Sequence, residues 1–230
     1  ERLARNMAVL PFVQIPRVHW AWTRERVNVQ DYVVGIAGHD LDLLDAAGLD
    51  RRLLARRGAQ AVLKMIVEDG FFHADPHPGN VFYLPDNRLA FIDFGMVGHL
   101  SMRRRQQLLK LLLGLVQREP QTVVDVLLDW TRDGQSVSVE RLESDIEAFL
   151  EQYHGIPLAE LSLGRMLVDV TAILRENHLA LPADLALLIK AFITLEGLGR
   201  GLDPNFNMAG EALPLLQQVV RARYRPRAMA

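Results

Sequence analysis

The stretch that decides the fold is His73–Asn80, with the sequence HADPHPGN, followed downstream by FIDFG at Phe91–Gly95. Within it an aspartate stands two residues after the histidine, and an asparagine stands five residues after that aspartate. Phosphoryl transfer requires an acidic group that orients the attacking hydroxyl or water, and oxygen ligands that hold Mg²⁺ against the phosphates. Kinase catalytic loops supply these groups in this order, and an Asp-Phe-Gly follows them. The sequence therefore predicts phosphoryl-transfer chemistry between His73 and Gly95.

Four residues of this stretch are candidate site residues. Asp75 is expected to be the catalytic residue that positions the nucleophile. Asn80 and Asp93 are expected to bind the cofactor by ligating Mg²⁺, because such oxygen ligands suit a hard cation that keeps waters and binds substrate phosphates. His73 is placed in the catalytic group with Asp75, and we expect it to brace the loop rather than to react.

A metal-binding cluster is the alternative interpretation of the same stretch. His73, Asp75 and His77 alternate along the chain, as ligands on one face of a strand would. Pro76 and Pro78 would interrupt any regular strand there, and no further pair of ligand residues stands nearby in the sequence. We therefore favour the phosphoryl-transfer interpretation.

Between the two motifs the sequence predicts a β-hairpin. Two short apolar runs, Val81–Leu84 and Leu89–Ile92, flank Pro85–Asn87, whose composition is typical of a tight turn. Such a hairpin would bring Asn80 and Asp93 to one edge of the fold.

The rest of the chain predicts one more strand and a series of helices. A β-branched run over 27–34 indicates a short strand ending at Gly35, a short helix is expected from His39-Asp40, and a longer one from Asp50 to a stop at Gly70. After Ser101 the segments are amphipathic and helical. Six helices are expected there: Ser101 to about Gln117, Glu119-Pro120 to about Arg132, Ser138–Tyr153, Leu163–His178, Pro182–Leu198 and Met208–Arg223.

These elements predict a mainly α-helical α+β fold. It would be a protein-kinase-like C-terminal lobe, in which a helical bundle packs behind a small β-hairpin at the catalytic cleft. We divide the chain into residues 1–35, a remnant of the N-lobe and hinge, and residues 36–230, the helical C-lobe. The second part holds the catalytic loop 73–80 and the Asp-Phe-Gly at 93–95.

Composition excludes several other classes of protein. The formal net charge is −2, from 26 basic and 28 acidic residues, which gives none of the basic footprint expected of a nucleic-acid-binding protein. The chain has no cysteine, so disulfides and thiolate metal sites are excluded. Its longest apolar run, Leu111–Val116, is far shorter than the roughly 20 residues of a membrane span. The chain begins Glu1-Arg2-Leu3 without a methionine, and we expect it to be a soluble fragment.

Several motifs together resemble the signature of the UbiB/AarF family of atypical kinases. The resemblance covers most of the chain from about residue 27 onward, and the loop motif is its most specific part. It implies a kinase-like fold that binds ATP with Mg²⁺, and a role in ubiquinone biosynthesis or lipid homeostasis at membranes. Family members look more like ATPases or small-molecule kinases than peptide kinases. The matching segments are Asp69–Asn80, Ile92–Gly98, Leu181-Pro182, Lys190–Phe192, Glu196-Gly197 and Leu202–Phe206.

The chain also departs from the family pattern. The family's N-lobe carries a nucleotide-covering loop, an ATP-anchoring lysine with a glutamate partner, and a Lys-x-Gly-Gln extension, and none of these occurs here. The three lysines, Lys64, Lys110 and Lys190, all follow the predicted hinge. The hinge would recognise adenine through Gln30 and Tyr32, although a methionine-glutamate pair is usual there. We therefore expect the full-length protein to be a phosphotransferase or ATPase and this chain alone to be inactive.

The resemblance implies further partners and a location for the full-length protein. They are ATP, a small lipidic or quinone-pathway molecule and a membrane surface, at the cytoplasmic side of the inner membrane and without nucleic acid. Two alternatives remain open. One is a small-molecule phosphotransferase resembling aminoglycoside or choline kinases, which the motifs after Leu181 disfavour. The other is an inert pseudokinase that binds a nucleotide or partner without turnover.

Overall fold

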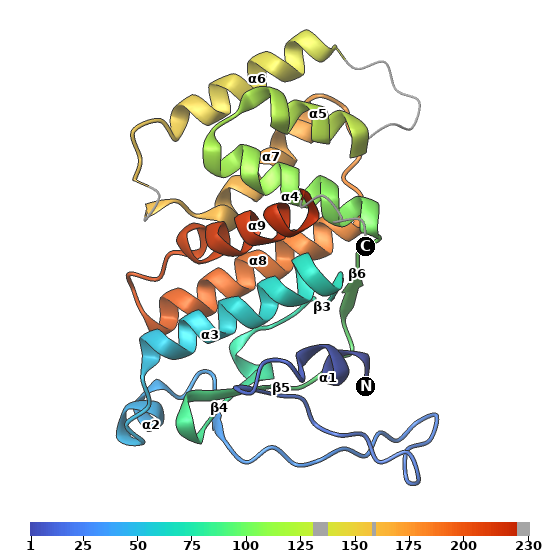
Figure 1. Cartoon of the computed structure of the whole chain (residues 1–230), viewed down its shortest axis with the longest axis vertical. Helices are drawn as coiled ribbons and strands as arrows, with labels where there is room; N and C mark the ends of the chain where they lie inside the picture. Colours follow the sequence, from blue (N-terminus) through green and yellow to red (C-terminus); the bar gives the residue numbers. More distant parts are fainter. Residues whose placement is uncertain (131–137, 158–159, 225–230) are drawn as a thin grey trace, which may run out of the picture.

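The chain folds with a four-stranded sheet toward one end, a stack of helices at the other, and a two-stranded sheet, β3 with β6, between them (Figure 1). This arrangement is seen in a computed structural model, which describes residues 1–130, 138–157 and 160–224. Helices dominate the described residues, and the strands are short. The predicted class, mainly helical α+β, is confirmed.

The predicted hairpin is present and forms the centre of a larger sheet. Strands β4 (Val81–Leu84) and β5 (Arg88–Phe91) pair in antiparallel fashion around a 3₁₀ turn at Pro85–Asn87. Two strands of two residues each extend this sheet. β1 (Val13–Gln14) runs parallel to β5, and β2 (Ile36–Ala37) runs antiparallel to β4, so the strand order is β1-β5-β4-β2.

The prediction of a strand over 27–34 is wrong. In that segment Val27 and Gln30 form only isolated bridges, to Arg24 and Val18, and the regular strand β2 starts after Gly35. Strand propensity largely reflects side chains packing on a half-buried pleated surface. Val27 and Val34 are exposed and have no such surface to cover, so the β-branched composition does not produce a strand.

Capping residues set the start and end of the long helix in the first part of the chain. α1 spans Arg2–Met7 and α2 spans Leu41–Ala46. α3 (Arg51–Lys64) begins at Asp50, whose side chain accepts a hydrogen bond from the backbone N–H of Leu53. The helix continues as a π-helical turn, Met65–Asp69, and ends at Gly70, which has a left-handed φ of 61°. The expected long helix is thus confirmed.

The six helices expected after Ser101 are also confirmed. α8 runs beyond its predicted end at Leu198, and the predicted end of the second helix, Arg132, lies outside the described residues. Among the described residues no helix has the length and apolar character needed to cross a bilayer. The helices are α4 (Met102–Gln117), α5 (Pro120–Trp130), α6 (Val139–Gln152), α7 (Leu163–Glu176), α8 (Ala183–Leu202) and α9 (Met208–Tyr224).

One apolar core joins the sheets to the helices. α3 packs against α8, α9 and β5, and these three helices lie side by side in Figure 1. One face of the hairpin enters this core through Val81, Tyr83, Leu89 and Phe91, all of which are fully buried. The hairpin is therefore held by its buried face, and its other face is left for other contacts.

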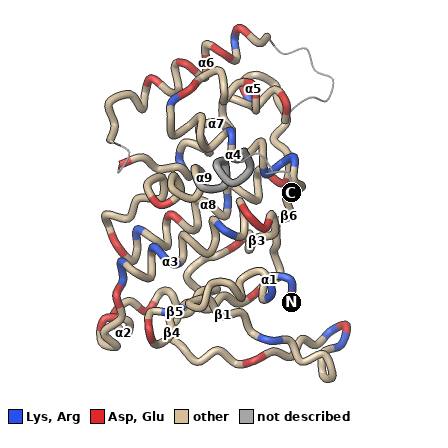
Figure 2. The backbone as a smooth tube through the Cα atoms, viewed as in Figure 1, with Lys and Arg blue, Asp and Glu red and all other residues tan. Residues whose placement is uncertain are grey.

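Basic and acidic side chains gather on different helices. Figure 2 shows α3 with mostly basic segments and α6 with mostly acidic ones. Arg52 of α3 lies 3.3 Å from the carboxylate of Asp203, which follows α8, and Arg56 lies 3.4 Å from that of Glu211 in α9. Pairs this exposed stabilise only slightly, by roughly 0–1 kcal/mol each. Apolar packing therefore contributes far more than these pairs to holding the three helices together.

A second, two-stranded sheet carries the start of the catalytic loop. β3 (Phe71–His73) pairs with β6 (Val97–His99), with Phe72 directly opposite Gly98. Phe72 is fully buried, and a Cβ atom added at Gly98 would lie 2.1 Å from its ring. Only glycine allows this approach, so Gly98 fixes how closely the residues after Asp-Phe-Gly lie against the catalytic loop.

We predict that Gly98→Ala destabilises the protein. The added methyl group must displace the buried Phe72 ring, and overpacking of this kind typically costs roughly 1–3 kcal/mol. The measurement is the free energy of unfolding in urea. Gly197→Ala is the matched control, because Gly197 lies in α8 with open space around it and alanine there should stabilise by about 0.5–1 kcal/mol. Equal stability of Gly98→Ala and the unsubstituted protein would contradict the steric argument.

Candidate phosphoryl-transfer site

His73 links the catalytic loop to the end of the hairpin. Its ring is fully buried at the end of β3, with Nδ1 3.1 Å from the backbone nitrogen of Asp75 and Nε2 3.0 Å from the carbonyl oxygen of Ile92. A backbone N–H can only donate, so Nδ1 accepts, and Nε2 carries the proton that it donates to Ile92. Both ring nitrogens are thereby used in holding two segments together.

The environment of His73 favours its neutral form. Burial lowers the pKa of the imidazole, while the hydrogen bond to Ile92 and the nearby Asp75 and Asp93 carboxylates oppose this effect. A neutral ring with both nitrogens occupied does not offer a metal ligand. His77 is also engaged, since its Nδ1 accepts from the backbone N–H of Gly79 at 3.0 Å. Among the described residues no group of three His, Asp or Glu side chains is placed to hold a metal, so the alternative cluster is not formed.

Asn80 joins the loop to the hairpin by two further bonds. It is buried at the end of a 3₁₀ turn, Pro78–Asn80, immediately before β4, and its side-chain Nδ2 donates to the carbonyl oxygen of Asp75 at 3.1 Å. Its own carbonyl oxygen accepts from the backbone N–H of Ile92 at 3.0 Å. With Nδ2 used in this way, Oδ1 is the atom of the Asn80 amide that remains for a cation.

Asp93 stands in a tight turn immediately after β5. Its φ is 55°, a left-handed conformation that is uncommon for residues other than glycine, and its Oδ1 accepts from the backbone N–H of Gly95 at 3.2 Å. The ring of Phe94 lies 5.4 Å from that of His73, and the backbone N–H of Ala74 donates to Met96 at 3.0 Å. This turn leaves Asp93 exposed while its neighbours on both sides are tied to the catalytic loop.

The structure therefore brings three of the predicted residues to one edge. Asp75 and Asn80 share a hydrogen bond, and Asp93 follows Ile92, which bonds both Asn80 and His73. Hydrogen bonds and ring contacts between 73–80 and 92–96 hold this arrangement.

The predicted hinge residues lie elsewhere, on the long connection between β1 and β2. Gln30 is exposed, and the Tyr32 side chain is 89% exposed. No hydrogen bond of the described residues links either side chain to the catalytic loop. The residue that follows, Val33, is buried instead against Leu84 and Ala90 of the hairpin. The segment thus meets the hairpin through Val33.

The contacts of Val33 define a small apolar platform on the outer face of the hairpin. Side chains alternate between the two faces of a strand, so Phe82 and Leu84 share one face of β4, opposite to Val81 and Tyr83. The cluster contains Val33, Leu84 and Ala90, with Phe82 and Ile92 packed against it (the apolar platform from here on). Asn80 and Asp93 stand at one end of it, since Asp93 directly follows Ile92 and Asn80 precedes Phe82 by two residues. Val33, Leu84 and Ala90 are buried within this cluster, and its half-buried members, Phe82 and Ile92, lie beside a polar edge with oxygen ligands.

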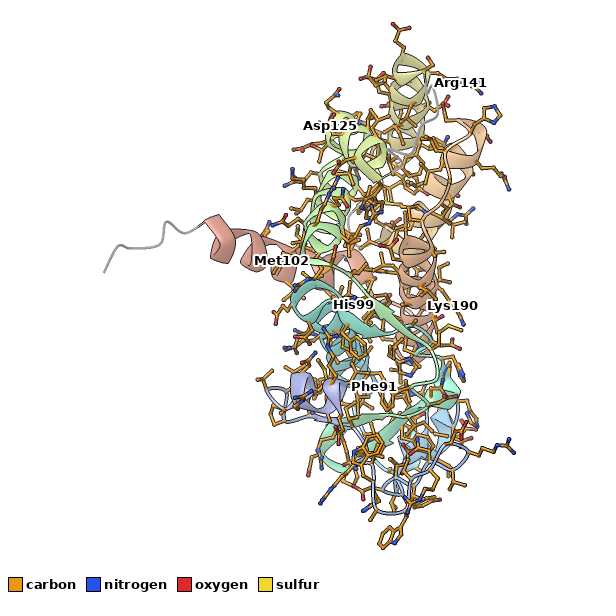
Figure 3. The ribbon with its side chains drawn as sticks, turned by 90° about the vertical axis from the view of Figure 1, so that its right-hand side faces the viewer. Phe91, His99, Met102, Asp125, Arg141 and Lys190 are labelled. Carbon is orange, nitrogen blue, oxygen red and sulfur yellow. The ribbon has the colours of Figure 1, made fainter. Side chains whose placement is uncertain are left out.

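Sequence reasoning assigned no role to Lys190, and the structure places it at the site. Its Nζ lies 3.1 Å from Oδ2 of Asp75 and 3.6 Å from the sulfur of Met96. Figure 3 shows Lys190 at the height of His99, where the helical part of the molecule meets the strands. Two signals were available: Lys190–Phe192 is one of the segments that match the family, and only three of the 26 basic residues are lysines.

We predict that His73 makes stability fall in mild acid. The unfolded chain binds a proton at His73 below a pKa of about 6.5, whereas the folded chain binds it only at lower pH, so unfolding takes up protons as pH falls. The free energy of unfolding in urea should therefore decrease more between pH 7.5 and 5.5 for the unsubstituted protein than for His73→Gln. His154→Gln, at an exposed histidine that follows α6, is the control for a histidine substitution away from the site. Equal slopes for His73→Gln and the unsubstituted protein would contradict a neutral buried His73.

Comparison with known proteins agrees with this geometry. A family model for the ABC1 atypical kinase-like domain matches residues 1–127, and one for the UbiB helical domain matches residues 146–207. The chain is 33% identical over 217 residues to the protein sll1770 of Synechocystis sp., covering 94% of this chain and 37% of that protein. It is 33% identical over 221 residues to a probable protein kinase UbiB of Xylella fastidiosa, covering 94% of this chain and 40% of that protein. The chain thus spans about two fifths of the length of these relatives.

A solved structure supports the fold independently. Rv3197 of Mycobacterium tuberculosis, solved in complex with erythromycin, aligns with a TM-score of 0.60 over 92% of this chain and 54% of its own, at 18% sequence identity. At that identity the likeness concerns the fold alone. The family follows from the two family models, with which the relatives at 33% identity agree: the chain belongs to the ABC1, or UbiB, family of atypical kinases.

Proposed function

We propose that the full-length protein is a Mg²⁺-dependent atypical kinase or ATPase that uses Asp75, Asn80 and Asp93. One observation carries this proposal: hydrogen bonds tie the 73–80 loop to 92–96, so these three side chains belong to one edge of the fold. Phosphoryl transfer depends almost wholly on positioning and electrostatic stabilisation. An edge fixed by its own hydrogen bonds meets the first of these requirements.

The residues present fit a magnesium ion. Asn80 offers Oδ1 and Asp93 offers a carboxylate, and Mg²⁺ is usually held by one or two protein oxygens together with substrate phosphates and waters. A bound Mg²⁺ would neutralise charge on the phosphates. Asp75 would orient the attacking oxygen and accept its proton as that oxygen bonds to the terminal phosphorus and the bond to the β-phosphate oxygen breaks, with ADP leaving. His73, neutral and fully bonded, would hold the Asp75 backbone in place.

The apolar platform supports ATP as the phosphate donor. A nucleotide needs an apolar surface for its base next to a polar site for its phosphates, and the two half-buried members of the platform, Phe82 and Ile92, lie at the end near Asn80 and Asp93. Backbone groups near Gln30 and Tyr32 would supply hydrogen bonds to the edge of the adenine. In this proposal the hinge acts through its backbone and Val33, since the Tyr32 side chain points to solvent.

We propose a small acceptor, or water, in place of a protein. Peptide kinases build their docking surface from a long segment between Asp-Phe-Gly and an Ala-Pro-Glu anchor. Here only 96–100 separates Gly95 from the cap of α4 at Ser101, and β6 within it is paired to β3. Met96 and Val97 expose 40% and 36% of their surface beside the site, which suits a lipidic acceptor. A quinone-pathway molecule at the cytoplasmic face of a membrane would meet this description.

The same reasoning concerns the 230-residue chain by itself. It carries no glycine-rich phosphate-covering loop and no N-lobe lysine, so the electrostatic stabilisation of transferred phosphate is incomplete. In our proposal this chain alone binds Mg-ATP weakly and turns it over negligibly.

The test of the function uses radiolabelled ATP with the full-length protein, a membrane extract and a mixture of soluble proteins. We predict label in lipid or in free phosphate, falling about a hundredfold or more in Asp93→Ala, as is typical when a charge-stabilising group is removed. Asp42→Ala, an exposed aspartate of α2, is the matched control and should retain full activity.

Two results would count against the proposal. Unchanged phosphate release in Asp93→Ala would contradict the assigned chemistry and leave an inert pseudokinase as the better description. Stoichiometric label on a protein, lost in Asp75→Asn, would instead show that the acceptor is wrong while the chemistry is right.

A further inference from the structure

Lys190 is a cation placed against the residue that would orient the nucleophile. Its ammonium lies 3.1 Å from Oδ2 of Asp75 and 3.6 Å from the sulfur of Met96, so it stands between the catalytic loop and the residue after Asp-Phe-Gly. Its side chain is 44% exposed and that of Asp75 is 28% exposed. The pair is therefore open to solvent on one side and able to rearrange when an anion arrives.

The position of Lys190 is set by a rigid helix. On α8 the side chains of Leu188, Ala191, Phe192 and Leu195 are buried in the main core, and the helix also packs against β6. Lys190 lies between these buried positions and projects toward the loop. Since its backbone cannot shift without moving the core, the reach of its flexible stem limits the ammonium to the vicinity of Asp75.

The charges of the site call for such a cation. Asp75 and Asp93 contribute two carboxylates, and a nucleotide would add its negatively charged phosphates beside them. A metal held by Asn80 and Asp93 would offset charge at one side of this group. At the Asp75 side, Lys190 is the cation that forms an ion pair within the described residues.

The other lysines show that this placement is particular to Lys190. Lys64 is used inside the fold, where its Nζ lies 2.8 Å from Asp69, at the other end of β3 from the loop. Lys110 is exposed on α4. A lysine ammonium is a compact charge with three rotatable donors, so it can leave a carboxylate for a phosphate oxygen more readily than a bidentate arginine can.

We propose that Lys190 binds the terminal phosphate of the nucleotide, and that Asp75 holds it ready before the nucleotide arrives. This inference rests on the proposed function and adds to it a phosphate-binding residue supplied by the helical part of the chain. Such a contact exists for a nucleoside triphosphate and is missing for a diphosphate. The difference in affinity between the two therefore measures it.

The experiment is calorimetric titration of the full-length protein with Mg-AMPPNP and with Mg-ADP. We expect Lys190→Gln to weaken AMPPNP binding by about tenfold to a hundredfold, the usual worth of a hydrogen bond to a charged group, and to leave ADP binding nearly unchanged. Lys190→Arg, which keeps the charge but can pair with Asp75 through two parallel hydrogen bonds, should recover only part of the loss. Lys110→Gln removes the same charge from α4 and should change neither affinity.

A second background separates direct phosphate contact from an effect on Asp75. In Asp75→Asn the lysine has no carboxylate to neutralise, so Lys190→Gln should still lower AMPPNP affinity if Lys190 touches the phosphate. Disappearance of the effect in that background would overturn the assignment and leave Lys190 as a residue that only neutralises Asp75. Thermal unfolding of each variant checks that the fold is retained.

The remaining outcomes are also decisive. An unchanged preference for AMPPNP over ADP in Lys190→Gln overturns the inference alone. A rise in AMPPNP affinity would do the same, because it would mean that the Lys190–Asp75 pair blocks the site. Failure of the unsubstituted protein to bind either nucleotide overturns the proposed function, and the inference with it.

Discussion

The site depends on one buried imidazole. His73 accepts a hydrogen bond from the backbone N–H of Asp75 and donates one to the carbonyl oxygen of Ile92, so a single ring connects the loop that carries Asp75 to the residue that precedes Asp93. Without either hydrogen bond, a buried polar group of the ring or the backbone would be unsatisfied, at a cost of about 1–3 kcal/mol. The pairing of β3 with β6 and the contact of Phe94 with the His73 ring enclose this connection and keep water from it. The ring thus has a structural role, and in the proposed function the chemistry is assigned to its neighbours.

Local signals in the sequence predicted much of this fold. Caps such as Asp50 and Ser101, the turn at Pro85–Asn87 and helical periodicity each depend on residues a few positions apart, and the helices and hairpin they predicted are present. The grouping of Asp75, Asn80 and Asp93 also followed from a hairpin between two motifs. The strands β1, β2 and β6 could not be predicted in this way, because two or three residues carry no periodicity and pair only with distant segments. The strand expected over 27–34 does not form, because a β-branched composition does not reveal whether a neighbouring strand is there to pair with it.

The position of Lys190 at the site also could not be predicted from local sequence signals. Its approach to Asp75 depends on how α8 crosses α3 and β6, which no pattern within the α8 sequence specifies. The same helix also organises the region beyond it. Glu196, buried two turns further along, accepts from the backbone N–H of Gly164 at 2.9 Å in the first turn of α7 and from Arg200 at 3.0 Å. A negative charge near the start of a helix is favourable. α8 thus contributes Lys190 to the candidate site and Glu196 to the contact with α7. These contacts give a structural reason for the family motifs at Lys190–Phe192 and Glu196-Gly197, which are far from the loop in the sequence.

The central claim is that Asn80 and Asp93 hold a divalent cation against the phosphates of a nucleotide. The most direct measurement is a crystal structure of the full-length protein grown with Mn²⁺ and AMPPNP, with data collected to locate manganese by its anomalous scattering. The account predicts an anomalous peak within bonding distance of Asn80 Oδ1 and the Asp93 carboxylate, and in contact with the nucleotide phosphates. A bound nucleotide whose manganese lies away from both side chains would contradict it.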